Sequence, residues 1–274
     1  MEVSYPAHSG LGFHLSDIAN TIIETADQFI TIKNTLNARV FLPSSHEPLP
    51  TVIVFHVYGD TQNLFTYRTV VCFAELEAQS TYPCIVIAPI IESPIYPSAS
   101  IRRKVLDGAM AYIDKLSAFG QVDESRIYVM GTSFGGMIAF EIAERFSERI
   151  EAVLAIRPAL NYALETIRFS LLSDVPIMIC HAKNDETFPA QVSLDAASFL
   201  RASGNASVIL RVYSDTEMEI AGARHDSFET YGFHHVELAI LSDACCADWL
   251  FIQHLPSNLK QKLPTAAGCI PAAV

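Results

Sequence analysis

The sequence lacks any apolar run long enough to cross a membrane, although 50% of its residues are hydrophobic. Its apolar segments are short, as in Thr51 to Val57 and Cys84 to Ile91, whereas a membrane-spanning helix needs about 20 consecutive apolar residues. The N-terminal stretch also lacks a basic start followed by an apolar core, which is the pattern of a secretory signal. We therefore expect a cytoplasmic chain that has no membrane-spanning helix.

Positive charge is scarce as well, with 18 basic residues against 30 acidic ones and a formal net charge of -12. The long-range field of such a chain repels phosphate backbones and anionic membrane surfaces. We therefore expect neither a nucleic acid nor a membrane as a partner.

The six cysteines lack the spacing of metal ligands. Cys180 stands inside an apolar run, where a free thiol packs as a small hydrophobic group. A disulfide between Cys72 and Cys84 stays open as an alternative, and we favour two free thiols. The cysteines therefore predict no metal site.

Short runs of β-branched and aromatic residues alternate with amphipathic segments along the 274 residues. The alternation predicts a parallel sheet covered by helices on both faces, and the length fits a single domain over 1–274. A polar stretch between the first two runs predicts an antiparallel hairpin, so we expect a mixed sheet of about eight strands. The expected strands are 28–34, 38–43, 51–57, 84–90, 126–132, 151–156, 175–181 and 207–213. The expected helices are 64–80, 100–119, 134–147, 160–173, 189–203 and 236–254.

The remaining segments predict loops rather than further domains. Two loops are long, at 91–99 and 214–235. The tail after about residue 255 is rich in proline, and we expect it to be loosely attached. No long insertion follows the apolar run 152–156, so we expect no large lid and an accessible site.

The stretch RIYVMGTSFGGMIAFEIAERF reads as a strand, a GTSFG turn at 131–135 and an amphipathic helix. Side chains at 131 and 135 would collide where the strand meets the helix, so glycine is needed at both positions. The turn holds Ser133 in a strained backbone conformation above the carboxyl edge of the sheet. Ser133 is therefore the candidate nucleophile, and the amide of Phe134, at the helix N-terminus, is a candidate donor to an oxyanion. An ordinary serine in a glycine-rich turn is the alternative, and the flanking strand and helix argue against it.

A serine nucleophile needs a histidine to take its proton and a carboxylate to orient that histidine. Asp185 follows the apolar strand Pro176 to Cys180 and precedes a new helix, so it is the candidate acid. A turn or N-cap aspartate is the alternative, and Glu186 is the local fallback.

The candidate base is His225, in the GARHDSF stretch after the last predicted strand. His234 and His235 lie nearby and are the alternatives. They stand where a helix begins, so packing sets the direction of their side chains, whereas a loop position leaves His225 free to point at the serine.

The stretch VIVFHVYGD ends the first parallel strand, where a second oxyanion amide is expected. Tyr58 is the candidate donor. We interpret His56 as a packed histidine at the strand end that braces the loop, rather than as a group that transfers protons.

Together these segments resemble the esterase, phospholipase and predicted-peptidase branch of the α/β-hydrolases, which is similar to the polyhydroxyalkanoate depolymerase and feruloyl esterase groups. The resemblance extends over most of the chain and implies an α/β-hydrolase fold. In that branch the serine of GxSxGG, the aspartate of HxxxDxxxP and the histidine of GxxHDxW form a triad, which implies Ser133, Asp185 and His225 here. The segments that carry it are VIVFHVYGD, VDESRIYVMGTSFGGM, PIMICHAKNDETFP, GARHDSF and the later DWLFIQ.

The chain departs from the family pattern in three places. Val57 stands where the family has a glycine in the oxyanion loop, and Phe228 replaces a tryptophan. Extra residues, including His234 and His235, separate His225 from the segment DWLFIQ. These departures bear on the shape of the oxyanion loop and on the identity of the histidine.

The sequence thus predicts a serine carboxylic-ester hydrolase that acts on small or medium soluble esters through an acyl-enzyme. Such a mechanism needs no metal ion and no organic cofactor. A serine peptidase on the same triad is one alternative. A non-catalytic ligand-binding protein on a hydrolase fold, motivated by Val57, is the other.

Overall fold

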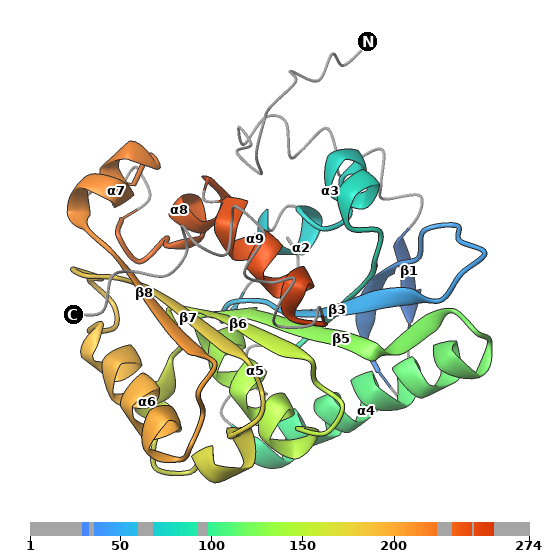
Figure 1. Ribbon diagram of the computed structural model, residues 1–274, viewed down its shortest axis with the longest axis horizontal. Helices are drawn as coiled ribbons and strands as arrows, with labels where there is room; N and C mark the ends of the chain where they lie inside the picture. The colour runs from blue at the N-terminus through green and yellow to red at the C-terminus, as the bar shows by residue number, and fades with distance from the viewer. Residues whose placement is uncertain are drawn as a thin grey trace.

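An eight-stranded sheet runs through the computed structural model, which describes residues 29–32, 36–59, 68–92, 98–223, 232–242 and 244–254 (Figure 1). The strand order β1-β2-β4-β3-β5-β6-β7-β8 is parallel from β4 to β8, and β2 runs antiparallel to both of its neighbours. The mixed sheet and its opening hairpin are therefore confirmed. The strands are β1 (Phe29–Ile32), β2 (Ala38–Phe41), β3 (Leu49–Phe55), β4 (Ile85–Pro89), β5 (Val122–Thr132), β6 (Ala152–Ile156), β7 (Ile177–Ala182) and β8 (Val208–Tyr213).

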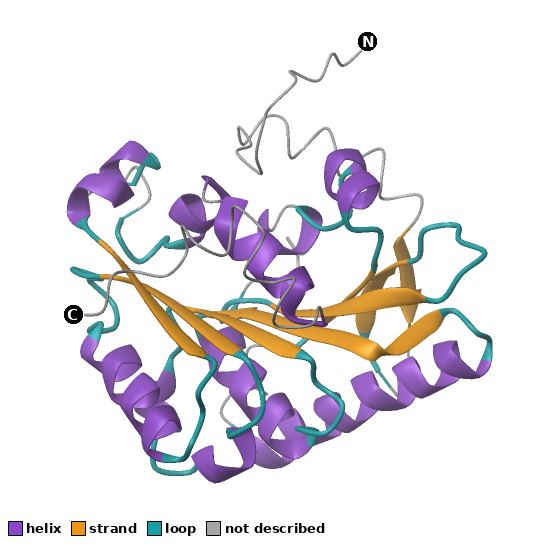
Figure 2. Ribbon diagram, viewed as in Figure 1, coloured by secondary structure: helices purple, strands orange, loops and turns teal. Residues whose placement is uncertain are grey.

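Helices cover both faces of the sheet, as the alternation of segments predicts (Figure 2). One face carries α4, α5 and α6, and the other carries α2, α3, α8 and α9 (Figure 1). The helices are α2 (Arg68–Val71), α3 (Leu76–Thr81), α4 (Ala99–Ala118), α5 (Phe134–Arg145), α6 (Gln191–Ala202), α7 (Asp215–Ile220), α8 (Glu237–Ser242) and α9 (Ala244–Phe251), with 3-10 turns η2 (Leu160–Tyr162), η3 (Phe169–Leu172) and η4 (Ile252–His254).

Strand β3 shows how the apolar runs produce these layers. Ile53 and Phe55 join the core beneath α4 to α6, and Val52 and Val54 join the core beneath α8 and α9. Successive side chains of a strand point to opposite faces. A strand that is buried on both faces therefore reads as a continuous apolar run.

Two predicted helices are wrong in form. The segment 160–173 contains the two short 3-10 turns η2 and η3 instead of one helix, although Leu160, Phe169 and Leu172 are buried in the core. The segment 64–80 contains two short helices, α2 and α3, with the turn residues 72–75 between them. Tertiary packing overrides local helix propensity in both segments. The segment 236–254 is helical over α8 and α9 and ends in the 3-10 turn η4, as predicted.

The predicted long loop 214–235 contains a helix, α7. The side chain of Ser214 accepts a hydrogen bond from the amide of Glu217, and the Glu217 side chain accepts one from the Ser214 amide. This reciprocal capping box starts helices from an S-x-x-E pattern. That pattern is present in the sequence and identifies the helix.

Cys72, Cys84, Cys180 and Cys246 are free and buried, which confirms the free thiols expected at positions 72 and 84. Burial raises the pKa of the Cys84 thiol to about 12. Among the helices that the structure describes, none combines the length and apolarity needed to span a membrane.

We expect Gly135→Ala to destabilise the protein by about 3 kcal/mol, because a methyl group at this position of α5 would lie 2.1 Å from the carbonyl oxygen of Phe55. Gly204→Ala is the control. Gly204 has a φ of 94° but no atom within 4 Å of an added methyl group, so only backbone strain of about 1 kcal/mol opposes it. Urea unfolding measures both losses, and equal losses would contradict the close contact between α5 and β3.

Candidate active site

Ser133 lies between β5 and α5 with a φ of 57° and a ψ of -118°. Its amide donates to the carbonyl oxygen of Ile156 at 2.9 Å, and its own carbonyl accepts from the amides of Met137 and Ala159. Such a conformation costs about 1–3 kcal/mol and persists only when its surroundings impose it. The strand, turn and helix predicted around Ser133 are therefore all present, and backbone hydrogen bonds hold the strained residue in place.

The glycines around Ser133 are required by close backbone contacts. A methyl group at Gly131 would lie 2.1 Å from the carbonyl oxygen of Gly135, and one at Gly136 would lie 2.9 Å from the Cα atom of Pro158. Real Cβ atoms do not approach other atoms so closely. The GTSFGG pattern thus reflects the crossing of strand, turn and helix at Ser133, as the sequence predicts.

His56 follows β3 and is fully buried. Its Nε2 atom accepts a hydrogen bond from the amide of Ile91 at 3.0 Å, so its proton is on Nδ1, which donates to the carbonyl oxygen of Val57 at 2.6 Å. Both nitrogens are thus engaged with backbone. This arrangement fits the predicted role of His56 as a brace for the loop after β3.

The two residues predicted to supply oxyanion amides lie side by side. Tyr58 follows β3, Phe134 starts α5, and their ring centroids are 5.3 Å apart. Further aromatic rings continue this row. Phe134 stacks on Tyr162 at 5.2 Å, Tyr162 meets Phe188 edge to face at 6.1 Å, and Phe188 meets the ring of His234 at 5.4 Å. An aromatic row therefore joins the loop after β3 to the segment before α8.

Asp185 follows β7, and its side chain is completely buried. Its Oδ1 atom accepts from the amides of Thr187 at 2.7 Å and Phe188 at 3.0 Å, and both carboxylate oxygens lie 2.8 Å from Nδ1 of His234. Nε2 of His181 lies 3.3 Å from Oδ2. Burial raises the pKa of Asp185, but hydrogen bonds from His181 and His234 outweigh it, so the pKa lies well below its ordinary value. Asp185 is therefore an ionised acceptor at neutral pH.

His181 supports Asp185 from within β7. Its Nε2 faces two acceptors, the Asp185 carboxylate and the carbonyl oxygen of Phe188 at 3.1 Å, so this nitrogen carries the proton. Its Nδ1 then accepts from the hydroxyl of Ser193 at 2.7 Å. His181 is not among the site residues expected from the sequence, although it is the histidine of the HxxxDxxxP pattern that contains Asp185.

His234 lies in the loop before α8 with 18% of its side chain exposed. Because Nδ1 donates to Asp185, Nε2 is left unprotonated in the neutral ring. Burial lowers the pKa of His234, and the charge of Arg157 adds to this, whereas Asp185 and Glu237 act in the opposite direction without cancelling the shift. The ring is therefore neutral at pH 7 and has a nitrogen that can accept a proton.

His225, the base that the sequence favours, lies outside the described residues, so its role stays a prediction. Both alternatives are described. His234 contacts Asp185, whereas Nδ1 of His235 lies 2.9 Å from Oε1 of Glu237. The Ser133 hydroxyl and the His234 ring, both within the described chain, are not hydrogen-bonded to each other, and such contacts often tighten only when substrate binds.

Glu186, the fallback acid, does not contact a histidine ring in the described chain. Its carboxylate accepts hydrogen bonds from the amides of Phe233 and His234, each at 3.0 Å. Asp185 therefore meets the ring of His234 and Glu186 meets its backbone.

A buried ion pair lies beside His234 and was missed from the sequence. Arg157 follows β6 with a φ of 38°, and its Nη2 atom lies 3.0 Å from Oε2 of Glu237, the first residue of α8. Both side chains are less than one tenth exposed. Burial raises the pKa of Glu237, but Arg157 and His235 outweigh it and lower the pKa to about 2. The two residues are 80 positions apart, so no local pattern could have paired them.

Within the described residues, no three or more His, Cys, Asp or Glu side chains gather to hold a metal ion.

The strand order, the elbow at Ser133 and the Asp185–His234 pair at the carboxyl edge together define an α/β-hydrolase fold. Residues 95–219 match the model of the Dienelactone hydrolase family. The matched segment contains Ser133 and Asp185 but ends before His234. The resemblance to α/β-hydrolases is thus confirmed, and the family match supports a hydrolase. No curated protein matches the chain in sequence.

Solved structures with the same fold include esterases and a peptidase. A thermostable esterase matches with a TM-score of 0.67 and 22% identity. The match covers 83% of this chain and 64% of the esterase. Est1E from Butyrivibrio proteoclasticus matches with a TM-score of 0.57 and 18% identity over 82% of this chain and 98% of its own. The acylaminoacyl peptidase of Pyrococcus horikoshii has a TM-score of 0.53 and 14% identity, over 78% of this chain and 39% of its own. At these identities the likeness is one of fold.

We expect Glu237→Gln to lower the free energy of unfolding by about 3 kcal/mol at pH 7, because it leaves Arg157 buried without a counter-charge. The pKa of Glu237 is lowered from 4.5 to about 2, so this contribution is complete above pH 4.5 and is lost as the pH falls toward 2. Urea unfolding across this range, wild type against variant, measures the difference.

The control for this prediction is Glu144→Gln, which breaks the more exposed pair between Glu144 and Arg168. Such pairs contribute less than about 1 kcal/mol. A Glu237→Gln variant that loses no more stability than this control would contradict the role of the buried pair.

Proposed function

We propose that this chain is a serine ester hydrolase in which Ser133 is the nucleophile, His234 the base and Asp185 the acid. The observation that carries the proposal is the hydrogen bond between Nδ1 of His234 and the buried carboxylate of Asp185, at the sheet edge that also carries the Ser133 elbow. This bond leaves Nε2 of a neutral imidazole as the proton acceptor. His234 takes the place of His225 in this proposal because of that contact.

In the proposed reaction, the Ser133 hydroxyl oxygen bonds to the ester carbonyl carbon as its proton passes to Nε2 of His234. The amides of Phe134 and Tyr58 hold the oxyanion. The bond to the leaving alcohol then breaks, and the alcohol takes the proton from His234. Water next attacks the acyl-enzyme, gives its proton to His234 and releases the carboxylic acid, while Ser133 regains its hydrogen. Asp185 stays ionised throughout and stabilises the imidazolium, which its lowered pKa favours.

The proposed substrate is a small or medium ester with an apolar group beside the carbonyl. The aromatic row from Tyr58 through Phe134 and Tyr162 to Phe188 lies between the oxyanion loop and His234 and supports this choice. Peptide hydrolysis on the same groups is the second candidate, supported by the shared fold of an acylaminoacyl peptidase. Parallel assays with nitrophenyl esters and aminoacyl nitroanilides separate the two.

Ser133→Ala is expected to abolish ester turnover while leaving the fold intact, because the backbone bonds at this turn do not involve the hydroxyl. The measurements are hydrolysis of nitrophenyl butyrate, the circular dichroism spectrum and labelling by a fluorophosphonate followed by mass spectrometry. Label on Ser133 in the wild-type protein supports the proposal. Retention of more than a few per cent of the rate would exclude Ser133 as the nucleophile, and no label on folded wild type would favour a non-catalytic binding protein.

His234→Gln is expected to lower kcat by about 10³ or more, because the Nε2 acceptor is lost. His225→Gln and His235→Gln are the matched controls and should retain most of the rate. His235 is a demanding control, since it is adjacent in the chain and is bonded to Glu237 instead of Asp185. A His225→Gln variant that loses kcat while His234→Gln keeps it would restore His225 as the base.

A further inference from the structure

A carboxylate that the proposed reaction does not use binds the backbone of residues 232–235, the segment before α8 that we call the histidine segment. Oε1 of Glu186 accepts from the amide of Phe233, and Oε2 accepts from the amide of His234, both at 3.0 Å. Two successive amides directed at one carboxylate form an anion-binding turn, and hydrogen bonds to an ionised acceptor are stronger than neutral ones. Glu186 thus binds the histidine segment at the peptide that carries the proposed base.

The neighbouring glycine leaves room for this contact. An added Cβ atom at Gly232 would lie 3.0 Å from Oε1 of Glu186 and 3.3 Å from its Cδ. A side chain at this position would therefore press on the carboxylate. The absence of a side chain at 232 lets Glu186 approach the amides that follow.

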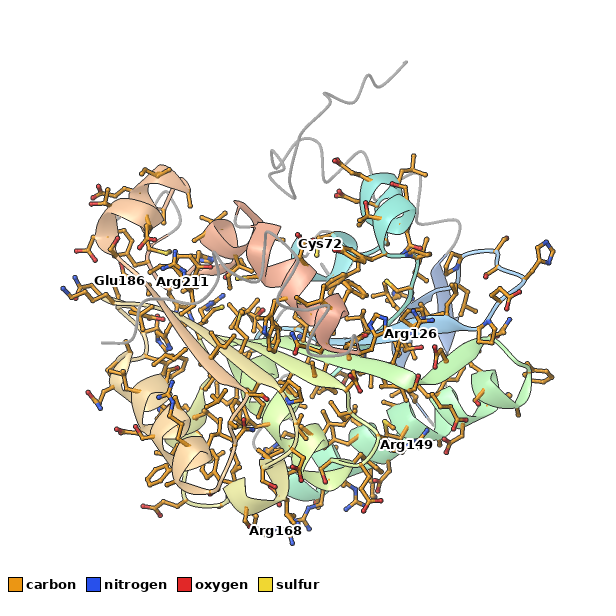
Figure 3. All side chains as sticks on the ribbon, viewed as in Figure 1. Cys72, Arg126, Arg149, Arg168, Glu186 and Arg211 are labelled. Atoms are coloured by element: carbon orange, nitrogen blue, oxygen red, sulfur yellow. The ribbon has the colours of Figure 1, made fainter. Side chains whose placement is uncertain are left out.

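Asp185 and Glu186, which are adjacent in one turn, therefore bind the ring and the backbone of the same histidine. Asp185 binds the His234 ring at 2.8 Å and Glu186 binds the His234 amide at 3.0 Å. The position of the His234 ring depends on its backbone as well as on its hydrogen bond. The backbone fixes the Cα atom, and the side-chain torsion angles then place the ring relative to that atom. Glu186 lies at the outer end of the sheet, on the same side of the view as Arg211 of β8 (Figure 3).

We propose that Glu186 is a positioning residue that fixes the backbone of the base through the amides of Phe233 and His234. The inference rests on the proposed function of His234 and deepens it. Glu186 is exposed, so water can replace it at the two amides when it is removed, and stability changes little. Catalysis is more sensitive, because a displacement of about 1 Å in a catalytic group can cost a factor of about 10².

The test compares Glu186→Gln with Glu219→Gln. Glutamine keeps the shape of Glu186 but offers one carbonyl oxygen in place of two carboxylate oxygens. Glu219 is an exposed residue of α7. Helix α7 lies beside the turn that contains Asp185 and Glu186, since the side chain of Asn184 donates to the carboxylate of Asp215 at 2.9 Å. The control therefore removes an equal charge from the same region without touching the histidine segment.

Three measurements are made on the full chain of each variant: kcat and KM with nitrophenyl butyrate, the pH dependence of kcat/KM, and amide hydrogen exchange at residues 233 and 234. Within the described residues, the charged and titratable groups around His234 and its partner Asp185 are Glu186, His181, Arg157, Glu237 and His235. Glu186 belongs to the same turn as Asp185, His181 to β7, Arg157 to the segment after β6 and Glu237 to α8. Changes shared by both variants report charge, and changes confined to position 186 report the hydrogen bonds.

We expect Glu186→Gln to lower kcat about tenfold with KM unchanged and to accelerate exchange at 233 and 234, while the melting temperature stays within a few degrees. Glu186→Asp should recover part of kcat, and it replaces the glutamine variant if that one does not fold. Unchanged exchange and kcat within twofold of Glu219→Gln would overturn the proposal. If His234→Gln itself is fully active, the proposed function fails, while exchange at 233 and 234 still decides whether Glu186 holds the segment.

Discussion

The buried carboxylate of Asp185 is the group around which the carboxyl edge of this sheet is organised. An ionised group without water must have its lone pairs satisfied by the protein. Its donors come from its own turn, from His181 of β7 and from His234 before α8. Segments 49 positions apart are therefore held together by the need to solvate one charge, and the same bonds orient the histidine.

Two further carboxylates, those of Glu186 and Glu237, lie beside the histidine segment in different surroundings. Glu186 binds backbone amides at the surface, where water competes with it. Glu237 is buried, and its partner Arg157 offsets the cost of removing it from water. The pair also leaves little net charge beside His234, since Arg157 lowers the pKa of that ring and Glu237 raises it. Glu186 thus contacts the backbone of this histidine, Asp185 contacts its ring, and burial together with the Arg157–Glu237 pair acts on its pKa.

The strain at Ser133 belongs to the same edge but has a different origin. Backbone crossing, rather than charge, imposes it, because the first turn of α5 lies against the carbonyl groups at the end of β3. Glycine at 135 admits this contact, and the amide of Ser133 is fixed on β6. The serine and the histidine are therefore positioned independently, one by steric packing and the other by ionic hydrogen bonds, and both belong to the carboxyl edge of the sheet.

The sequence by itself determined the eight strands, the hairpin, the elbow at Ser133 and the turn that carries Asp185, because each depends on local periodicity or on a short glycine pattern. It predicted one helix over 160–173, whereas packing against the core produced two short turns there. The tertiary structure alone decided that His234 meets Asp185 and that Arg157 meets Glu237. Spacing along the chain says nothing about such contacts, since a loop may present any of its histidines. The direction of a side chain is set by the groups that surround it after folding.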